Sequence, residues 1–294
     1  MDDGSFIRYL ASKRSVDDRA LNRLVWDAMI AAARDPSASL RVFPYARGDG
    51  PRVLELGGGI GTMVDRVAEE GRLLPGSWTM IDAQPALIAK ARQRLAHTAP
   101  FPLELLATDL DAYLALPFRP FDLVIANAFL DLLDPPRALP RLAGLCRPGG
   151  LFLFSITFDG LTVLEPEIDR DLDTRIVELY HRTMDERMTS GERSGDSRCG
   201  RHLLTLLPRC GYGIMAAGSS DWIVHPRNGE YPADERFFLS CILGFFEESL
   251  SARPELDRAT LDRWLRARRE QLAAGELVFM AHQLDVLASV EVRS

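Results

Sequence analysis

Cysteine is scarce and scattered in this sequence of 294 residues. The four cysteines lie far apart and none forms a CxxC pair, so the ligand spacings of zinc ribbons and iron–sulfur clusters are missing. Sparse cysteine usage is typical of proteins in the reducing cytosol. Residues 1–5 are acidic and lead into no apolar run, which is unlike a signal peptide. We therefore expect a cytoplasmic protein with no metal site.

A long apolar run and an excess of basic charge are missing as well. The most apolar stretch, residues 237–246, is too short to cross a bilayer, so no membrane insertion is expected. There are 35 Lys and Arg residues against 42 Asp and Glu, a net charge of −7, whereas proteins that bind nucleic acid usually carry a basic footprint. The 47% of hydrophobic residues can fill a sizeable core. A soluble protein that handles a small molecule fits this composition better than a nucleic-acid binder.

The N-terminal residues 1–50 read as a helical prefix without a core of its own. Apolar side chains recur there at helical spacing, at Phe6, Leu10, Leu21, Leu24, Val25, Ala28 and Met29. A Pro- and Gly-rich stretch over residues 36–51 then marks the boundary to the next element.

Residues 51–159 show the rhythm of a parallel sheet. Short apolar runs bounded by Gly, Pro or Asp predict strands at 53–56, 78–81, 103–106, 121–125 and 151–156. Helical stretches lie between them at 62–70, 85–97 and 136–146. Stacked βα units of this kind form a parallel sheet covered by helices.

Beyond residue 159 the rhythm breaks. Residues 160–202 are polar and charged, and we expect them to form a lid inserted into the fold. Residues 203–294 return to the sheet and add a helical pair at 233–273. The predicted elements are a helix at 201–208, a strand at 212–224, helices at 233–251 and 258–273, and a last strand at 277–287. The apolar helix around 237–246 packs in a core by default; roofing an apolar pocket or forming a homodimer contact is the sharper alternative.

A glycine-rich loop follows the first predicted strand and opens a helix. Its sequence is Glu-Leu-Gly-Gly-Gly-Ile-Gly-Thr over residues 55–62, and the glycines let the backbone turn sharply and approach a ligand. A dinucleotide loop of the form GxGxxG would need its third glycine at Thr62, and the lysine of a phosphate-binding P-loop is absent. Taken alone, the loop is also compatible with a tight turn that binds nothing.

Five segments in order resemble the class I S-adenosylmethionine-dependent methyltransferases. Residues 55–61 resemble their first motif, residues 121–127 their fourth-strand motif, and residues 147–152 the turn into their fifth strand. Asp82 and Asp109, which end the second and third predicted strands, stand where the family's acids hold the ribose hydroxyls and the adenine amino group. Each acid also suits a simple helix cap, but all five motifs in sequence are hard to produce by capping.

The resemblance implies an α/β fold of the class I methyltransferase type, and within it a type 11-like small-molecule methyltransferase. In this Rossmann-like fold a mostly parallel sheet with one antiparallel strand carries helices on both faces; here a helical prefix and helical lid insertions are added. The implied cofactor is S-adenosyl-L-methionine. The residues implied to bind it are Glu55, Gly57, Gly59, Gly61, Asp82, Asp109, Leu110 and Asn127.

Methyl transfer is an in-line displacement that needs alignment more than acid–base chemistry. A base is required only when the acceptor must lose a proton. Asn127 is followed by Ala128 and Phe129, not by Pro-Pro-Tyr, so modification of exocyclic amines is not indicated. No Pro-Cys follows the fourth strand, so a covalent attack on cytosine lacks its nucleophile.

The histidines are the candidate bases. We rank His181 first and His202 second, because both lie in the predicted lid, which faces the transferred methyl group in related enzymes. A lid hydrogen bond or a helix cap is the simpler role for each. Glycines at 191, 195 and 200 would let the lid open and close, and arginines at 193, 198 and 201 would steer an anionic or polar acceptor unless they are merely solvated.

The expected function is transfer of a methyl group to an O, N or C atom of a small-molecule acceptor. The alternative is a non-catalytic S-adenosylmethionine-binding sensor or assembly protein. An elaborate lid favours the enzyme, because a sensor has little need to exclude water.

Overall fold

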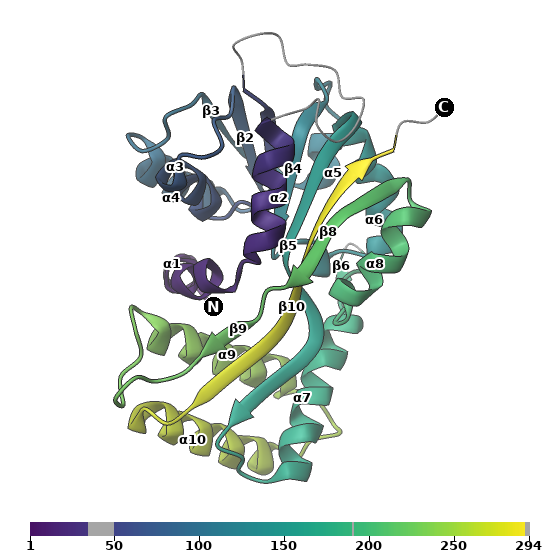
Figure 1. The fold of residues 1–294 in the computed structure, drawn as a ribbon. Helices are drawn as coiled ribbons and strands as arrows, with labels where there is room; N and C mark the ends of the chain where they lie inside the picture. The colour runs from purple at the N-terminus through teal and green to yellow at the C-terminus, as the bar shows by residue number, and fades with distance from the viewer. Residues whose placement is uncertain (35–49, 190, 292–294) are drawn as a thin grey trace.

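The computed structural model describes residues 1–34, 50–189 and 191–291 (Figure 1). Its main sheet has the order β3-β2-β1-β4-β5-β10-β8, with β9 added along β10. β1 to β5 are parallel, and β10 is antiparallel to β5, β8 and β9. The strands are β1 Arg52–Leu56, β2 Ser77–Asp82, β3 Leu103–Ala107, β4 Phe121–Asn127, β5 Cys146–Glu165, β8 Tyr212–Ser219, β9 Trp222–Val224 and β10 Val278–Val290. The expected mostly parallel sheet is confirmed.

Helices cover both faces of this sheet. The α-helices are α1 Asp3–Ala20, α2 Arg23–Arg34, α3 Thr62–Glu70, α4 Pro85–Leu95, α5 Leu110–Leu114, α6 Pro135–Leu142, α7 Arg170–Asp185, α8 Cys199–Arg209, α9 Glu235–Leu250 and α10 Arg258–Ala274. Short elements complete the chain: 3-10 helices at Leu130–Leu132 and Ala143–Leu145, and a hairpin of β6 Met188–Thr189 and β7 Glu192–Arg193. One buried cluster joins α2, α3 and α4 to the sheet, and another joins α5, α6 and α8 to its other face.

β1 lies inside the sheet, between β2 and β4, as the sequence predicts. Val53 pairs with Trp78 on one side and with Leu123 on the other. All three side chains are fully buried. A strand covered on both faces needs apolar side chains at consecutive positions, which explains why β1 reads as a short apolar run.

A second lobe is built on the C-terminal part of β5 and the N-terminal part of β10, in the lower half of Figure 1. We define it as the far halves of these two strands together with β9, α7, α9 and α10. β5 continues to Glu165, six residues beyond the boundary expected at residue 159. The polar composition concealed this extension, because only alternate residues such as Thr162 and Leu164 are buried while Leu161 is exposed.

The buried face of the second lobe is packed by helices, including the apolar helix α9. Phe238, Leu239, Ile242 and Phe246 of α9 belong to one buried cluster with residues of α1, α7, α10 and β10. The core interpretation of this apolar helix is therefore correct, and those side chains are not available for a dimer contact. A homodimer through another surface stays a prediction.

The two N-terminal helices are part of the core rather than an appendage. Val25, Trp26 and Met29 of α2 are buried against the main sheet. The Pro- and Gly-rich boundary predicted over residues 36–51 lies outside the described residues up to position 49. Among the described helices, none is long and apolar enough to span a membrane.

Candidate functional site

The glycine loop between β1 and α3 takes the left-handed backbone conformation that favours glycine. The φ angles of Gly57, Gly59 and Gly61 are 64°, 57° and 79°. Gly61 is the N-cap residue of α3 and brings no side chain to cap it, so backbone N–H groups of the first turn stay available to a ligand. The loop therefore presents donors to the space in front of the carboxyl end of β1.

Asp82 at the end of β2 is held by the backbone around it. Its Oδ2 accepts a hydrogen bond from the Gly59 N–H and its Oδ1 one from the Gln84 N–H, both over 2.9 Å. Partial burial raises the pKa of Asp82, while these two hydrogen bonds oppose that shift. A carboxylate offers about four lone-pair positions, so two remain for hydroxyl donors.

Glu55 lies beneath the loop and is buried. Its Oε2 accepts a hydrogen bond from Trp78 Nε1 over 3.1 Å. Burial raises the pKa of Glu55 to about 8, with the Trp78 hydrogen bond opposing the shift. Its carboxyl carbon is 3.0 Å from where a β-carbon on Gly58 would stand. Glu55 therefore supports the loop from within the fold and is largely protonated at neutral pH.

Asp109 and Asn127 end β3 and β4 in different surroundings. Asp109 is exposed and caps α5, since its Oδ1 accepts from the Ala112 N–H over 2.7 Å. Asp109 therefore does cap α5, and its Oδ2 can accept a hydrogen bond from a second partner. Leu110, the next residue, is half-buried. Asn127 Oδ1 accepts from Ser155 Oγ over 2.9 Å, which leaves the amide N–H₂ group as a donor.

Phe129 is a site residue that the sequence reasoning missed. Its ring lies against Gly57, so a β-carbon at position 57 would collide with it. The preceding Ala128 has a φ of 48° and donates its N–H to the Ser155 carbonyl over 2.8 Å, which folds the chain after β4 back towards the loop. An aromatic residue directly after Asn127 was the available signal.

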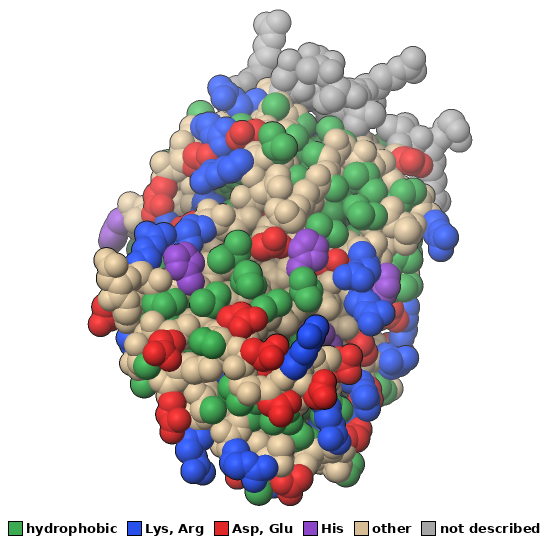
Figure 2. Space-filling view, turned by 60° about the horizontal axis from the view of Figure 1, so that its bottom comes forward, with side chains coloured by type: hydrophobic (Ala, Val, Ile, Leu, Met, Phe, Trp, Pro, Cys, Tyr) green, Lys and Arg blue, Asp and Glu red, His purple; other side chains and the backbone are tan. Residues whose placement is uncertain are grey.

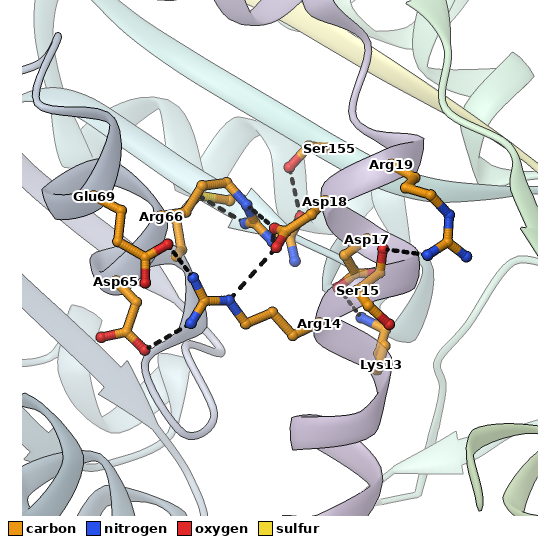
Figure 3. A network of polar contacts seen from close by, with 12 residues as sticks. Lys13, Arg14, Ser15, Asp17, Asp18, Arg19, Asp65, Arg66, Glu69 and Ser155 are labelled. Atoms are coloured by element: carbon orange, nitrogen blue, oxygen red, sulfur yellow. Dashed lines mark hydrogen bonds and ion pairs between the residues drawn. The ribbon is translucent and has the colours of Figure 1, made fainter. Parts of the chain in front are cut away.

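Helix α1 lies over the same loop. Leu10 stands 3.2 Å from where a β-carbon on Gly59 would be. On one side, Arg66 of α3 binds Asp18 over 2.6 Å, and Arg14 reaches Asp65 and Glu69, as Figure 3 shows.

On its other side, α1 is bound to α9 of the second lobe. Arg19 binds the buried carboxylate of Glu235 over 2.6 and 2.9 Å, and Ser15 also donates to it. The prefix helix thus connects the glycine loop to the second lobe, a role that helical periodicity alone did not reveal.

Polar groups of α1, the 3-10 helix Leu130–Leu132 and α7, together with Arg187 just after it, influence one another's ionisation. Asp131 Oδ1 is shielded from solvent and has no hydrogen-bond partner in the described structure. Burial raises the pKa of Asp131 to about 6, while the charges of Lys13 and Arg187 oppose the shift. Burial, followed by the charge of Asp17, raises the pKa of Tyr9, and the hydroxyl of Tyr180 and Asp131 add to this. We call Tyr9, Lys13, Asp131, Tyr180 and Arg187 the polar cluster.

The two candidate bases lie in different surroundings. His181 on α7 is partly buried, with Nε2 2.9 Å from Thr162 Oγ1 and its ring edge-on to Phe158. Burial lowers the pKa of His181 to about 4, so its ring is neutral at neutral pH. His202 on α8 is half-exposed and places Nδ1 2.6 Å from Asp196 Oδ2.

The segment before α8 is more firmly held than its glycines suggest. The Gly195 N–H donates to the Leu133 carbonyl over 2.8 Å, and the Asp196 N–H to the Asp131 carbonyl over 3.1 Å. Gly200 lies within α8, where a β-carbon would stand 3.0 Å from the Thr157 carbonyl oxygen. Gly195 and Gly200 therefore allow close packing in this structure, and their expected role in lid opening stays a prediction.

The three arginines expected to steer an acceptor, Arg193, Arg198 and Arg201, differ in their contacts. Arg201 is bound to Asp159 through Nε and donates to the Asp159 carbonyl over 2.7 Å. Arg193 donates to the Asp185 carbonyl over 2.9 Å. The exposed Arg198 has no side-chain hydrogen bond among the described residues. Of the three, only Arg201 is paired with an acid among the described residues, and the steering role stays a prediction.

Known families and structures agree with this arrangement. Residues 53–150 match a family model described as a methyltransferase domain. Residues 53–150 are thus identified as a methyltransferase domain, as the resemblance to the class I S-adenosylmethionine-dependent family implies. The cofactor of this domain is S-adenosylmethionine, and the positive-φ glycines, the uncapped N-terminus of α3 and the two open positions on Asp82 fit it.

Solved structures are similar in fold to this chain. The YcgJ protein of Bacillus subtilis is 11% identical, with 93% of this chain and 100% of that chain covered and a TM-score of 0.50. A methyltransferase from Thiobacillus denitrificans in complex with S-adenosyl-L-homocysteine is 13% identical, with 92% of each chain covered and a TM-score of 0.44. The [4+2]-cyclase SpnF is 17% identical, with 91% and 81% covered and a TM-score of 0.44. No curated protein sequence matches the chain significantly.

Proposed function

We propose that this methyltransferase transfers the methyl group of S-adenosylmethionine to a small-molecule acceptor. The observation that carries the proposal is the polar cluster beside the glycine loop. Leu10 contacts the loop and is followed one turn later by Lys13, while Phe129 contacts the loop and is followed by Asp131. A protein that only senses the cofactor has no need for a buried carboxylate oxygen without a partner, such as Asp131 Oδ1, at this position.

Each of the residues expected to bind S-adenosylmethionine has its own part of the cofactor to hold. Gly57, Gly59 and Gly61 let the backbone approach it, and Asp82 offers two lone-pair positions to the ribose hydroxyls. Asp109 offers its free oxygen to the adenine amino group, with Leu110 beside the ring. The Asn127 amide offers a donor, and Glu55 holds the loop in shape from below.

The bound cofactor supplies a methyl group already activated by the sulfonium charge. The protein must then align the acceptor and exclude water, and good alignment can lower the barrier by roughly 7–11 kcal/mol. α1 and the second lobe serve this purpose, because Arg14, Arg66 and Arg19 hold α1 over the loop from both sides. His181 and His202 stay candidates for binding or deprotonating the acceptor.

The surface supports a small acceptor in preference to nucleic acid. On the face shown in Figure 2, acidic and basic side chains are interspersed with apolar ones. The four cysteines are free among the described residues, which supports a place in the reducing cytoplasm.

The test combines binding with transfer. We expect S-adenosylhomocysteine to bind in calorimetry, NAD to give no heat, and radiolabelled methyl groups to pass from S-adenosylmethionine to a small-molecule cell extract. Binding without any transfer would favour the sensor or assembly role. Binding of NAD in place of S-adenosylhomocysteine would contradict the choice of cofactor.

A further inference from the structure

The carboxyl group of Asp131 stands apart from the other acids of the site. It follows β4 by four residues, in the 3-10 helix Leu130–Leu132, and its Oδ1 is buried without a partner. Glu55, Asp82 and Asp109 each accept a hydrogen bond from another residue, whereas the Asp131 carboxyl accepts one from its own backbone N–H and its Oδ1 stays without a partner. We propose that Asp131 accepts the proton of the methyl acceptor, and that the acceptor therefore presents an O–H or N–H group. The inference rests on the proposed methyl transfer.

The groups around Asp131 leave that position open. Lys13 Nζ, the nearest amine on α1, is bound to Asp17 Oδ2 over 2.9 Å. Asp17 is fixed in turn, since its Oδ1 accepts from Trp222 Nε1 over 2.9 Å. Lys13 thus balances charge near Asp131 while its hydrogen bond goes elsewhere.

The other elements packed against Asp131 contribute both signs of charge. Arg187, just after α7, has no side-chain hydrogen bond or ion pair among the described residues, and its charge lowers the pKa of Asp131. Asp196, in the segment before α8, raises it. Asp131 also interacts electrostatically with the hydroxyl of Tyr9 on α1 and the buried thiol of Cys199 on α8, and both are neutral at neutral pH because burial raises their pKa values.

This balance gives Asp131 the properties of a base that works near neutral pH. Its pKa of about 6 keeps most of the group ionised at pH 7 and leaves it basic enough to take a proton. His181 is less suited, because a ring with a pKa of about 4 holds a proton weakly.

The proposed step balances without a further reactant. The acceptor O–H or N–H bond breaks, and its proton moves to the Asp131 carboxylate. The electron pair left on the acceptor forms the bond to the transferred methyl carbon, whose bond to sulfur breaks with its pair remaining on sulfur. The proton on Asp131 then passes to water when the product leaves.

Asp131→Asn is the direct test, because it keeps the shape and an accepting oxygen but removes the base. Asp111→Asn is the matched control: Asp111 is an exposed acid paired with Arg141 on the surface. Both variants should bind S-adenosylhomocysteine like the wild type in calorimetry. Methyl transfer from labelled S-adenosylmethionine to a small-molecule extract should fall roughly 10²- to 10⁴-fold for Asp131→Asn only.

A measurement that does not depend on methyl transfer tests the ionisation of Asp131 independently of the activity. In carbon-13 NMR, the wild type should show an aspartate carboxyl titrating near pH 6 that is absent from Asp131→Asn, whereas the signals of Asp65, Asp82 and Asp285, whose pKa values burial also raises, remain in both spectra. Arg187→Gln should move that titration to higher pH, because a cation that favours the ionised form is lost.

The outcomes separate the two proposals. Normal transfer by Asp131→Asn, or a carboxyl that titrates below pH 4.5, would overturn the role of Asp131 and leave methyl transfer intact. A wild-type protein that transfers no methyl group would overturn the proposed function and this inference with it.

Discussion

The backbone N–H of Gly59 donates a hydrogen bond to the side chain of Asp82. The loop after β1 and the acid after β2 therefore position each other before any ligand binds. Preorganisation of this kind lowers the cost of binding, because the carboxylate does not have to be ordered by the cofactor.

Replacing Asp82 by Ala should weaken S-adenosylhomocysteine binding. The variant loses the carboxylate for the ribose hydroxyls, and each charge-assisted hydrogen bond is worth about 1.5–3 kcal/mol, or about tenfold or more in affinity. Calorimetry measures the change, with Asp111→Ala as the surface control. An unchanged dissociation constant would remove Asp82 from the site.

Gly57→Ala and Gly71→Ala form a matched pair. Both glycines have a φ of 64°, but a β-carbon at Gly71 meets nothing within 4 Å whereas one at Gly57 collides with Phe129. Gly71→Ala should cost about 1–2 kcal/mol of unfolding free energy from backbone strain alone. Gly57→Ala should cost more and also abolish S-adenosylhomocysteine binding. Equal losses in a urea titration would mean that Phe129 yields freely.

Arg19→Ala should loosen α1, whereas Arg8→Ala should not. Arg19 pairs with the buried Glu235, and its loss leaves a shielded carboxylate short of donors, at a cost of about 1–3 kcal/mol. Arg8 and Asp234 form an exposed pair, and solvent screening leaves such a pair little effect on stability. Hydrogen exchange should rise in α1 and stay slow in β1 and β4. Equal protection of α1 in both variants would contradict the role of the Arg19 contact.

Glu55→Gln should change how stability depends on pH. The pKa of Glu55 is about 8 in the folded protein against 4.5 ordinarily, so the folded state holds the proton more tightly. Its contribution is complete below about pH 4.5 and is lost as the pH rises towards 8. Gln is neutral throughout, so the variant should gain stability relative to the wild type between pH 5 and 8. Urea midpoints that differ by a constant amount over this range would refute the raised pKa.

His181→Ala and His202→Ala, made separately, test the two lid histidines. With Asp131 as the base, each variant should keep S-adenosylhomocysteine affinity and lose less than about tenfold in methyl transfer. A larger loss with a changed pH profile in either variant would assign the base to that histidine.

The sheet could be predicted from the sequence because its signals are local. β1, β2 and β4 are buried on both faces and so appear as unbroken apolar runs, and α3 begins at Thr62 as predicted, because the glycine at 61 marks its start. Asp82 was recognisable as a site residue because it directly follows such a run.

The second lobe and the polar cluster could not be predicted in the same way. The extension of β5 alternates exposed and buried residues with polar ones on both sides, so Leu161 and Thr162 give no clear period. Asp131 and Lys13 are more than a hundred residues apart in sequence, and only packing of α1 beside the chain after β4 brings their charges together.

The continuity of β5 and β10 determines how a ligand can enter. These strands pair from Leu151 to Glu165 without interruption by a linker, so the second lobe cannot swing away as a rigid body unless that ladder breaks. α1, in contrast, is joined to the rest at Leu21 and Asn22, and Asn22 is anchored to Asp285 over 2.8 Å. We therefore expect a ligand to enter when α1 turns about Asn22, which breaks the contacts of Arg14, Arg66 and Arg19 but leaves the sheet intact.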